Sequence, residues 1–559
     1  MPAPTGLSIS VIDSKTKGVP TAVFRRADSH EFYLHSRFDP LEEARFLVKD
    51  VPRRERTLYV VLGFGLRYHV KELLQRLPQS SHIVEMEPDF ACLSGRLLEN
   101  ADHQARAWIQ NSRLHFIALH NPKVTPIYLA DRQVRLRLLS LEMVIHIPST
   151  LTAVSFYRTL GTEILQTFPT SFHSHLNSLD QMLENDLLNF WANLPHSWNA
   201  APVKSLLDKW SGRPLIIVSP GPSLTDALPL LREAKSKALL LATGPAARIL
   251  MAEQIRPDLV LSLDPYEANL AHFKGWDTAD VPLVYYHRIN RGIPALYSGP
   301  KIFFAMQDEP PIPMSRSSER SDFWRGGSVA FSALQLAHYL EANPIIFVGQ
   351  DFAFAGGHTH ARGFIGDQAF DTKALPKDYF MVPGIDGSPV VTSRIYHAYL
   401  LYMENYLLDF ARLKPGVKHI NTSRIGAMIR GMDYLALEQA LATLAAPAQL
   451  SPRESITAAL EQNQRILKEA QTAALKRWET ELDHLLAQAD KFKDFDRLFA
   501  RFKATSVYAQ APRSYGDIYY LYETRYRGAN NQLHLPFLNR FKKHLQSVLE
   551  ELRKIRAAA

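Results

Sequence analysis

The sequence contains a single cysteine, no long apolar run and no concentrated block of positive charge. With only Cys92 available, an intramolecular disulfide is excluded and a cysteine-ligated metal cluster is not expected. No apolar run approaches the roughly 20 residues that span a bilayer, and the first residues lack the basic and apolar pattern of a secretory signal. We therefore expect a soluble, cytoplasmic protein without a membrane span.

The positive charge of the chain is spread along its length. The net charge is +8, which permits an anionic substrate, but basic pairs such as Arg25-Arg26 are typical of solvated surfaces. Neither a zinc-finger spacing nor an RNA-recognition signature is present, so no nucleic-acid partner is expected. The length of 559 residues, of which 46% are hydrophobic, suits about three globular domains.

The N-terminal part has the outline of a nucleotide-binding β-α-β unit. Thr57–Leu62 predicts a buried strand, Gly63-Phe64-Gly65 a turn, Arg67–Leu77 a helix and His82–Met86 a second strand. The acidic Glu87 then follows the second strand, where a ribose would lie. The third glycine of the usual fingerprint is missing, so a ligand site and a purely structural Rossmann-like fold both stay open.

The middle of the chain alternates strands with helices, which predicts a parallel sheet covered on both faces. Functional residues of such sheets collect at the carboxyl ends of the strands. The predicted strands are Pro214–Val218, Ala238–Ala242, Leu259–Leu263, Leu283–Tyr286, Lys301–Phe304 and Ile345–Val348.

The turn after the first of these strands predicts an anion site. Gly221 and Pro222 end the strand, Ser223 is suited to cap the following helix, and Asp226 has the spacing of a capping-box partner. Backbone N–H groups at such a helix start attract phosphate. An ordinary β-α turn is the alternative, because neither the P-loop nor the Gly-x-Gly-x-x-Gly pattern is present.

Two further strand-end loops carry candidate residues. Asp264 follows the third strand, where an acid can meet a ribose, a substrate hydroxyl or a metal, or can close a structural turn. Gly326, Gly327 and Ser328 precede a helix that Ser328 can cap, which predicts another anion contact.

The loop after the last predicted strand concentrates polar side chains. Gln350 and Asp351 follow the strand, and His358 and His360 lie in a glycine-rich stretch that predicts a mobile loop with acid–base groups. The two histidines with Asp351 could hold a metal, but no longer ligand pattern supports this. Structural histidines are the alternative.

The C-terminal part is predicted to be helical. Ser451-Pro-Arg-Glu454 is a strong helix start, and apolar residues then recur at helical spacing, as in a bundle or an antiparallel pair. The predicted domains are an α/β domain with bridging helices at 1–199, a central domain at 200–445 and a helical domain at 446–559.

Five motifs of the central part are Gly221-Pro-Ser-Leu224, Ser262-Leu-Asp-Pro265, Gly326-Gly-Ser-Val329, Phe347-Val-Gly-Gln-Asp-Phe352 and Gly356-Gly-His-Thr-His-Ala361. They occur in the order seen in the motility-associated factor (Maf) flagellin glycosyltransferases, and the chain resembles this family through about residue 435. Val61–Leu66 with Glu87-Pro-Asp89 resembles the family's amino-terminal domain. The chain departs from the family pattern at two places, Ser219-Pro220 before the first motif and Asn421–Gly426. These departures bear on the identity of the donor more than on the fold.

The resemblance implies a central Rossmann-like domain similar to bacterial sialyltransferases (GT-A-like). It also implies transfer of a pseudaminic- or legionaminic-type nonulosonic acid from a CMP donor to serine or threonine of flagellin, as needed for flagellum assembly and motility. No metal or other cofactor is expected. His360 and Asp264 are then the expected catalytic residues, and the expected donor-binding residues are Gly221, Pro222, Ser223, Gly326, Gly327, Ser328, Gln350 and Asp351.

Two other functions stay open. Archaeal 6-hydroxymethylpterin diphosphokinases share the central domain, and their reaction would need Mg²⁺ and ATP. A non-catalytic flagellin-binding factor that keeps the fold is the third possibility.

Overall fold

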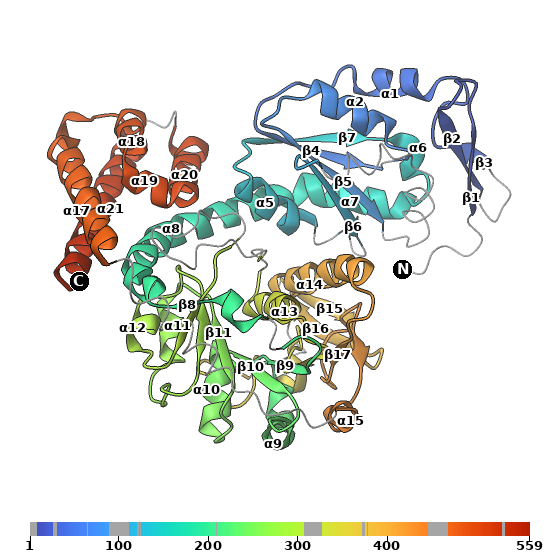
Figure 1. Ribbon diagram of the computed structural model, residues 1–559. Coiled ribbons are helices and arrows are strands. Elements are labelled where there is room, and N and C mark those ends of the chain that lie inside the picture. The colour runs from blue at the N-terminus through green and yellow to red at the C-terminus, as the bar shows by residue number, and fades with distance from the viewer. Residues whose placement is uncertain are drawn as a thin grey trace. The chain divides into compact units, whose positions relative to one another are not determined.

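A computed structural model gives the fold of the chain (Figure 1). The chain divides into two compact units, Met1–Ser178 and Leu179–Ala559. Within the described part, no helix has both the length and the apolar character that crossing a membrane requires. The division into three domains at 199/200 and 445/446 stays a prediction. The described residues are 8–25, 31–63, 65–88, 111–119, 122, 125–207, 210–306, 323, 327–369, 371, 375–376, 378–444, 468–527 and 531–558.

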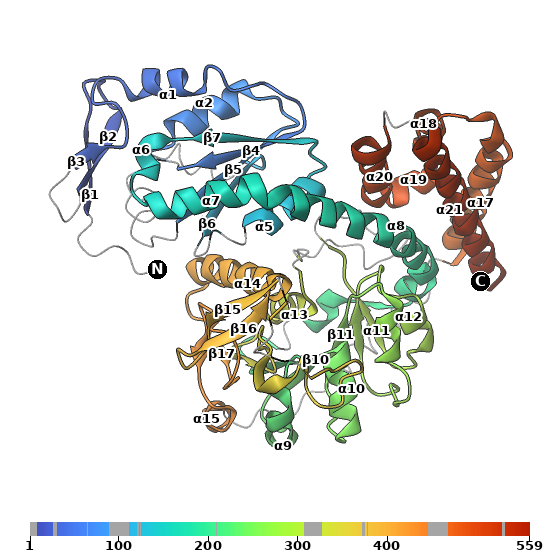
Figure 2. The ribbon, with the colours of Figure 1, turned by 180° about the vertical axis from the view of Figure 1, so that it is seen from behind.

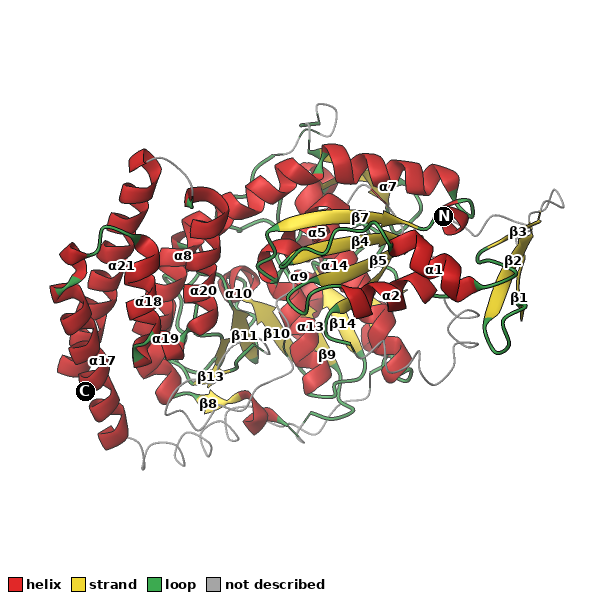
Figure 3. Ribbon diagram, turned by 90° about the horizontal axis from the view of Figure 1, so that it is seen from above, coloured by secondary structure: helices red, strands yellow, loops and turns green. Residues whose placement is uncertain are grey.

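The first unit contains a four-stranded parallel sheet with the order β6-β5-β4-β7. Figure 3 shows β7, β4 and β5 side by side. The two predicted strands are confirmed as β4 and β5, and the predicted helix as α2, whose N-cap Arg67 has a positive φ of 65°. Every side chain of β4 is buried, as expected for a strand with neighbours on both edges. The strands are β4 (Thr57–Leu62), β5 (His82–Pro88), β6 (Leu114–Leu119) and β7 (Ser140–Ile145).

Helices and a small antiparallel sheet complete this unit. The small sheet has the order β1-β2-β3 and precedes the parallel sheet in the chain. Its strands are β1 (Ser8–Asp13), β2 (Pro20–Arg25) and β3 (Glu31–Tyr33). The helices are α1 (Pro40–Val48), α2 (Tyr68–Arg76), α5 (Thr125–Arg135), α6 (Ile147–Thr150) and α7 (Val154–Gln166).

The second unit is built on a nine-stranded parallel sheet with the order β18-β17-β14-β9-β10-β11-β12-β13-β8. All six predicted strands are confirmed, whereas β8, β17 and β18, which have two or three residues each, were not predicted. The strands are β8 (Ala201–Pro202), β9 (Leu215–Val218), β10 (Leu239–Thr243), β11 (Leu259–Ser262), β12 (Leu283–Tyr285), β13 (Lys301–Phe303), β14 (Ile345–Val348), β17 (His419–Asn421) and β18 (Asp433–Tyr434).

Both faces of the central sheet are covered. Leu215 and Ile217 of β9 share an apolar cluster with Leu334 and Met403 from two of the helices, while the alternate β9 residues are buried as well. A two-stranded hairpin, β15 (Tyr379–Pro383) with β16 (Pro389–Ser393), extends this unit. The helices that accompany the sheet are α9 (Leu224–Ala234), α10 (Gly244–Ala252), α11 (Glu267–Ala271), α12 (Gly292–Leu296), α13 (Val329–Tyr339), α14 (Arg394–Leu413) and α15 (Leu437–Ala442).

The C-terminal segment is helical, as predicted. Its helices lie together in both views (Figures 1 and 2). The long helix α8 (Phe168–Trp198) packs against them through Trp191, whose indole N–H donates to the Tyr515 hydroxyl at 2.9 Å. Tyr515 and Tyr520 are fully buried in the core of these helices. The C-terminal helices are α17 (Lys468–Ala487), α18 (Phe495–Lys503), α19 (Ser506–Gln510), α20 (Pro512–Leu521) and α21 (Asn531–Ala558).

The helix start predicted at Ser451 lies outside the described residues. The fold class is nevertheless confirmed: the protein is α/β, with a large parallel sheet in its central part, a smaller α/β region before it and a helical C-terminal region.

Candidate active site at the strand ends of the central sheet

The central sheet changes direction between β9 and β14. From β9 the chain adds β10, β11, β12 and β13 on one side, and β14 then pairs with β9 on the other side. At such a point the loops after two neighbouring strands diverge, and the crevice outside their carboxyl ends is the usual ligand site of open α/β sheets. The loops after β9 and β14 both carry residues that the sequence singles out.

The turn after β9 packs directly against the turn after β14. The Gly221 N–H donates to the Gly349 carbonyl at 3.0 Å. A Cβ atom at Gly221 would lie 2.4 Å from that oxygen and 2.6 Å from Oδ2 of Asp351. Gly349 itself has a φ of +72°, which favours glycine. Position 221 therefore requires glycine because a backbone and a carboxylate approach it so closely.

A buried carboxylate occupies the start of helix α9. Asp351 accepts hydrogen bonds from the Ser223 N–H at 2.8 Å, the Ser223 hydroxyl at 2.5 Å and the Ser423 hydroxyl at 2.5 Å. Burial raises the pKa of Asp351, and these three hydrogen bonds act in the opposite direction. The carboxylate thus takes the position at the positive end of the helix where an external anion would bind.

This arrangement corrects two details of the sequence prediction. Ser223 does precede the first residue of α9, but its hydroxyl bonds Asp351, so no capping box forms with Asp226. The N–H groups predicted to be free for phosphate at Gly221 and Ser223 are bonded within the protein, and Pro222 has none to offer. The role of Gly221, Pro222 and Ser223 in donor binding stays a prediction.

Gln350 is a buried link between three strands. Its side-chain oxygen accepts from the Ser219 hydroxyl at 2.9 Å, and its backbone carbonyl accepts from the Asn421 side chain at 3.4 Å. These contacts connect the ends of β9, β14 and β17. The structure therefore gives Gln350 a positioning role, and direct contact with a donor stays a prediction.

His360 lies above this junction with one ring nitrogen directed at a phenol. Its Nε2 is 3.4 Å from the Tyr396 hydroxyl, its Nδ1 is 3.2 Å from the Thr359 hydroxyl, and its ring stacks on Phe364 with 3.8 Å between centroids. Burial lowers the pKa of His360, and the charge of Asp367 opposes this shift. The imidazole is therefore neutral near pH 7, as a general base must be.

One acidic side chain holds the histidine loop in shape. Asp367 accepts the His360 N–H at 3.0 Å, the Thr359 hydroxyl at 3.1 Å and Nδ1 of His358 at 3.0 Å. The hydrogen-bond partners of the two histidines are thus Asp367, Thr359 and Tyr396, rather than Asp351 as a shared metal site would require.

The histidine loop is also tied to the turn after β9. The Ala361 N–H donates to the Pro220 carbonyl at 2.9 Å, and the Arg362 N–H donates to the Thr225 hydroxyl at 3.0 Å. These bonds bring His360 to the same edge of the sheet as Ser223.

Tyr396 is a site residue that sequence reasoning missed. It lies in the first turn of α14, which Ser393 caps by accepting the Tyr396 N–H at 3.1 Å. Its ring stacks on Phe354 at 5.1 Å, and burial raises the pKa of its hydroxyl to about 12. The hydroxyl therefore stays protonated. Because Tyr396 is 36 residues from His360 in the chain, no local spacing links the two.

Asp264 lies apart from this group. It follows β11, two strands from β9, and its Oδ1 accepts the Tyr266 N–H at 2.9 Å, so it closes a local turn. Burial raises its pKa, and the hydrogen bond from Tyr266 opposes the shift. Within the described residues it makes no hydrogen bond or ion pair with His360 or Asp351. A catalytic role for Asp264 stays a prediction.

The third predicted loop is described only in part. Ser328 caps α13 by accepting the Phe331 N–H at 3.2 Å, which confirms it as the cap. Gly327 has a φ of +31°, and a Cβ atom there would lie 2.3 Å from the ring of Tyr399. Gly326 lies outside the described residues. Anion binding by this loop stays a prediction.

A cavity of about 300 Å³ opens at the loops after β14 and β17. Its wall includes Gly426, whose backbone lies so close to Asp351 that an added Cβ would be 2.8 Å from the Asp351 Cα. Arg424 lies at this cavity with a largely exposed side chain that pairs with Glu438 at 3.2 Å. The lining comes from the loops after β14 and β17 and from the β15–β16 hairpin: Phe354, Gly356, Met381, Asp386, Ser388, Pro389, Val390, Val391, Arg424, Ile425 and Gly426.

One comparison with known proteins concerns the same region of the chain. A family model described as 6-hydroxymethylpterin diphosphokinase MptE-like matches residues 188–357, which include every strand from β8 to β14. This confirms the resemblance to pterin diphosphokinases that the motifs predicted for the central part.

Two individual proteins are also similar. An uncharacterized protein of Treponema pallidum (strain Nichols) is 49% identical over 43 residues, which make up 8% of this chain and 11% of that protein. A solved structure of a Maf glycosyltransferase from Magnetospirillum magneticum AMB-1 is 14% identical, with a TM-score of 0.42, over 98% of this chain and 90% of that chain.

Proposed function

We propose that this protein is a glycosyltransferase that moves a nonulosonic acid of the pseudaminic or legionaminic type from its CMP-activated donor to a serine or threonine of flagellin. The observation that carries the proposal is the neutral His360, with Nε2 directed at Tyr396, at the switch point of the central sheet. The ordered motifs that resemble the Maf family support the substrate class.

The proposed chemistry requires a base for the acceptor hydroxyl. As the bond from the acceptor oxygen to the anomeric carbon forms, the acceptor loses its proton and CMP leaves with the electrons of the bond that breaks. The proton reaches Nε2 of His360 through the Tyr396 hydroxyl, which gives its own proton to Nε2 as it takes the proton of the acceptor. Because burial lowers the pKa of His360, the base is already deprotonated at neutral pH. No metal or other cofactor takes part in this scheme.

The departing phosphate needs positive charge. Asp351 already uses the Ser223 N–H, so we assign this task to Arg424 at the rim of the cavity. Its ion pair with Glu438 is exposed, and such pairs contribute only about 0–1 kcal/mol, so the guanidinium can turn to a phosphate at little cost. A volume of about 300 Å³ suits part of a sugar nucleotide, since small-molecule sites measure about 300–1,000 Å³.

A second candidate function is favoured by the family model that matches residues 188–357. A 6-hydroxymethylpterin diphosphokinase would transfer a diphosphate from ATP to the pterin hydroxymethyl group with Mg²⁺, and would release AMP. The two reactions therefore differ in the nucleotide that they release.

The test is a product analysis with the full chain. We expect CMP release that requires both flagellin and a CMP-nonulosonate, together with a mass increase of flagellin by one or more sugar residues. AMP formation from ATP, Mg²⁺ and 6-hydroxymethylpterin would replace this function by the second candidate. Folded protein that binds flagellin but produces neither nucleotide would leave a non-catalytic binding factor.

The phosphate contact is tested separately. Arg424→Gln should raise the KM for the CMP donor about 10-fold, with a smaller change in kcat, because a ground-state charge contact is lost. Arg232→Gln, which removes the same charge at the other end of α9, serves as the control and should change neither. An unchanged donor KM in Arg424→Gln would remove Arg424 from the site.

A further inference from the structure

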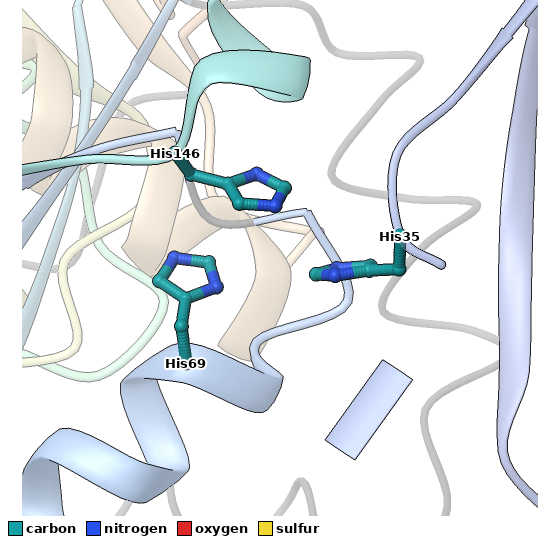
Figure 4. Close-up of side chains that lie close together, drawn as sticks. All are labelled: His35, His69 and His146. Carbon is teal, nitrogen blue, oxygen red and sulfur yellow. The ribbon is translucent and has the colours of Figure 1, made fainter. Parts of the chain in front are cut away.

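Three buried histidines come together in the first unit, far along the sequence from the candidate site residues of the central sheet. His35 follows strand β3, His69 lies in the first turn of α2, and His146 follows strand β7. Each offers a ring nitrogen, and these nitrogens lie within 4.8 Å of one another. Figure 4 shows the three rings arranged around a common point.

The cluster occupies the switch point of the first parallel sheet. From β4 the chain adds β5 and β6 on one side, and β7 returns to pair with β4 on the other side. His146 follows β7, and the turn Gly63–Gly65 follows β4. The histidines therefore lie at the place where open α/β sheets usually bind ligands.

The glycine turn makes room for the imidazoles. Gly65 has a φ of +51°, and a Cβ atom there would lie 2.5 Å from Nε2 of His35 and 3.0 Å from Cε1 of His146. Gly63 has a φ of +86°, and its Cβ would lie 2.4 Å from the Cβ of Ser149. A side chain at either position would push into the ring cluster or its support. The two glycines of the turn that the sequence predicts as a possible ligand site thus pack directly against the histidine cluster and Ser149.

The hydrogen bonds of His69 and His35 determine where the lone pairs of these two rings lie, and the contact of His146 with Ser149 allows a lone pair on Nε2 of His146. Nε2 of His69 faces the Gly63 carbonyl at 3.1 Å, so Nε2 carries the proton and Nδ1 has the lone pair. Nδ1 of His35 faces the Glu43 carboxylate at 3.3 Å, which likewise places its lone pair on Nε2. Nδ1 of His146 is 2.7 Å from the Ser149 hydroxyl, which can accept its proton.

Two of the resulting lone pairs lack a partner in the protein. Nδ1 of His69 and Nε2 of His146 are buried and make no hydrogen bond. The third, on His35 Nε2, accepts the Leu66 N–H at 2.8 Å. Buried unpaired polar atoms are costly, and several in one place call for a ligand.

We propose that His35, His69 and His146 bind one divalent transition-metal ion, with Zn²⁺ as the preferred ion. Neutral imidazoles are ligands for zinc and its neighbours, whereas Mg²⁺ and Ca²⁺ prefer oxygen. Tetrahedral Zn–N bonds of about 2.0–2.1 Å need nitrogens about 3.4 Å apart, so the rings move slightly inward and His35 releases the Leu66 N–H. Three protein ligands leave a fourth position for water or an anion.

The hydrogen-bond partners of the ring nitrogens that would not bind the metal fit this assignment. Glu43 holds Nδ1 of His35 and also accepts the Ser36 N–H at 2.9 Å, so its own position is fixed. The Gly63 carbonyl and the Ser149 hydroxyl do the same for the other two rings. A carboxylate, a carbonyl and a hydroxyl behind metal-bound histidines set the tautomer and raise the basicity of the ligand nitrogen.

The experiment uses the full chain without a polyhistidine tag, stripped with a chelator and then titrated with Zn²⁺ by calorimetry. We expect one equivalent of Zn²⁺ per chain in the wild type, and its loss in His69→Gln and in His146→Gln. His115→Gln is the matched control. It removes a histidine from β6 of the same sheet, where the partner is His82 at 3.1 Å, and should retain the equivalent.

A positioning variant makes the assignment sharper. Glu43→Gln keeps the ligands and should weaken Zn²⁺ binding about 10–100-fold, the usual effect of losing such a support. Bound Co²⁺ should give the wild type the intense visible absorption of a tetrahedral site. This measurement uses only the wild-type protein, so it does not require that any variant folds.

The proposal is overturned if the folded wild type takes up neither Zn²⁺ nor Co²⁺, in which case the histidines form a metal-free cluster. It is equally overturned if His69→Gln and His146→Gln, shown by circular dichroism to be folded, bind Zn²⁺ as tightly as the wild type. If those two variants fail to fold, the Co²⁺ spectrum of the wild type and the affinity of Glu43→Gln decide.

Discussion

The two parallel sheets of this protein each have a switch point, where the strand order changes direction, and the two switch points differ in their chemistry. In the first unit, the glycine turn after β4 makes room for three imidazoles, one of which follows β7. In the second, β9 and β14 end at a glycine turn that makes room for one carboxylate, that of Asp351. The first switch point presents imidazole nitrogens whose lone pairs can bind a cation. The second places a negatively charged carboxylate at the start of helix α9.

The comparison shows what topology decides and what it leaves open. Strand order fixes where loops converge, and in both units a glycine allows side chains from distant segments to reach the turn. Which ligand class fits is decided by those side chains alone. A helix start after a glycine turn is therefore not sufficient evidence of a phosphate site, because the protein can supply its own anion, as Asp351 does here.

The largest expected effect concerns the base of the second switch point. His360→Ala should lower kcat for CMP release about 10²–10⁴-fold, because general base catalysis at the acceptor hydroxyl is lost. His358→Ala, in the same loop and more exposed, is the matched control and should retain most of the activity. Steady-state rates with saturating donor and flagellin measure both. Equal losses in the two variants would indicate a disturbed loop and not a missing base.

Removal of the buried carboxylate should give the next largest effect. Asp351→Ala leaves the Ser223 N–H and two serine hydroxyls without their acceptor, which should destabilise the start of α9 by about 2–4 kcal/mol. Hydrogen exchange of the α9 amides measures this. Asp226→Ala, an exposed acid in the first turn of the same helix, should cost less than about 1 kcal/mol. Equal protection in both variants would show that Asp351 does not hold the helix.

The glycines of the two turns should differ in their tolerance of alanine. Gly221→Ala places a Cβ against a backbone carbonyl, which should cost about 2–3 kcal/mol. Gly65→Ala meets an imidazole that can move, so we expect about 1–2 kcal/mol together with weaker Zn²⁺ binding. Gly18 also has a φ of +75°, but it has open space around it. Gly18→Ala should therefore show only the cost of the backbone strain, about 1 kcal/mol. Chemical denaturation compares the three, and a Gly65→Ala cost above that of Gly221→Ala would contradict the order.

The sequence predicted the parts of the fold that depend on local pattern. Runs such as Pro214–Val218 and Thr57–Leu62 are apolar throughout, and such runs bounded by glycine or proline become buried parallel strands. The edge strands of the central sheet, β8 and β18, escaped prediction because two residues cannot show a pattern. For example, β18 is only Asp433–Tyr434.

The contents of the two sites depend on contacts between distant segments. Ser223 has the local signature of a cap, yet its hydroxyl is bonded to a residue 128 positions later. His35, His69 and His146 have no ligand spacing, and only the order of the strands brings them together. The glycine turns could be predicted because they are local, whereas the groups that fill them could not.

The smallest expected effect is a shift in the pH dependence of the second site. Activity requires neutral His360, so kcat/KM should be level near pH 7 and should fall only as pH decreases through its lowered pKa. The charge of Asp367 opposes that lowering, and Asp367→Asn removes the charge while its amide oxygen can still accept the His360 N–H. The pKa of His360 should then fall further, and the acidic limb of the profile should move to lower pH. Asp378→Asn, an exposed acid paired with Arg394, should leave the limb in place. A limb that moves to higher pH in Asp367→Asn, or stays where it is, would assign it to a group other than His360.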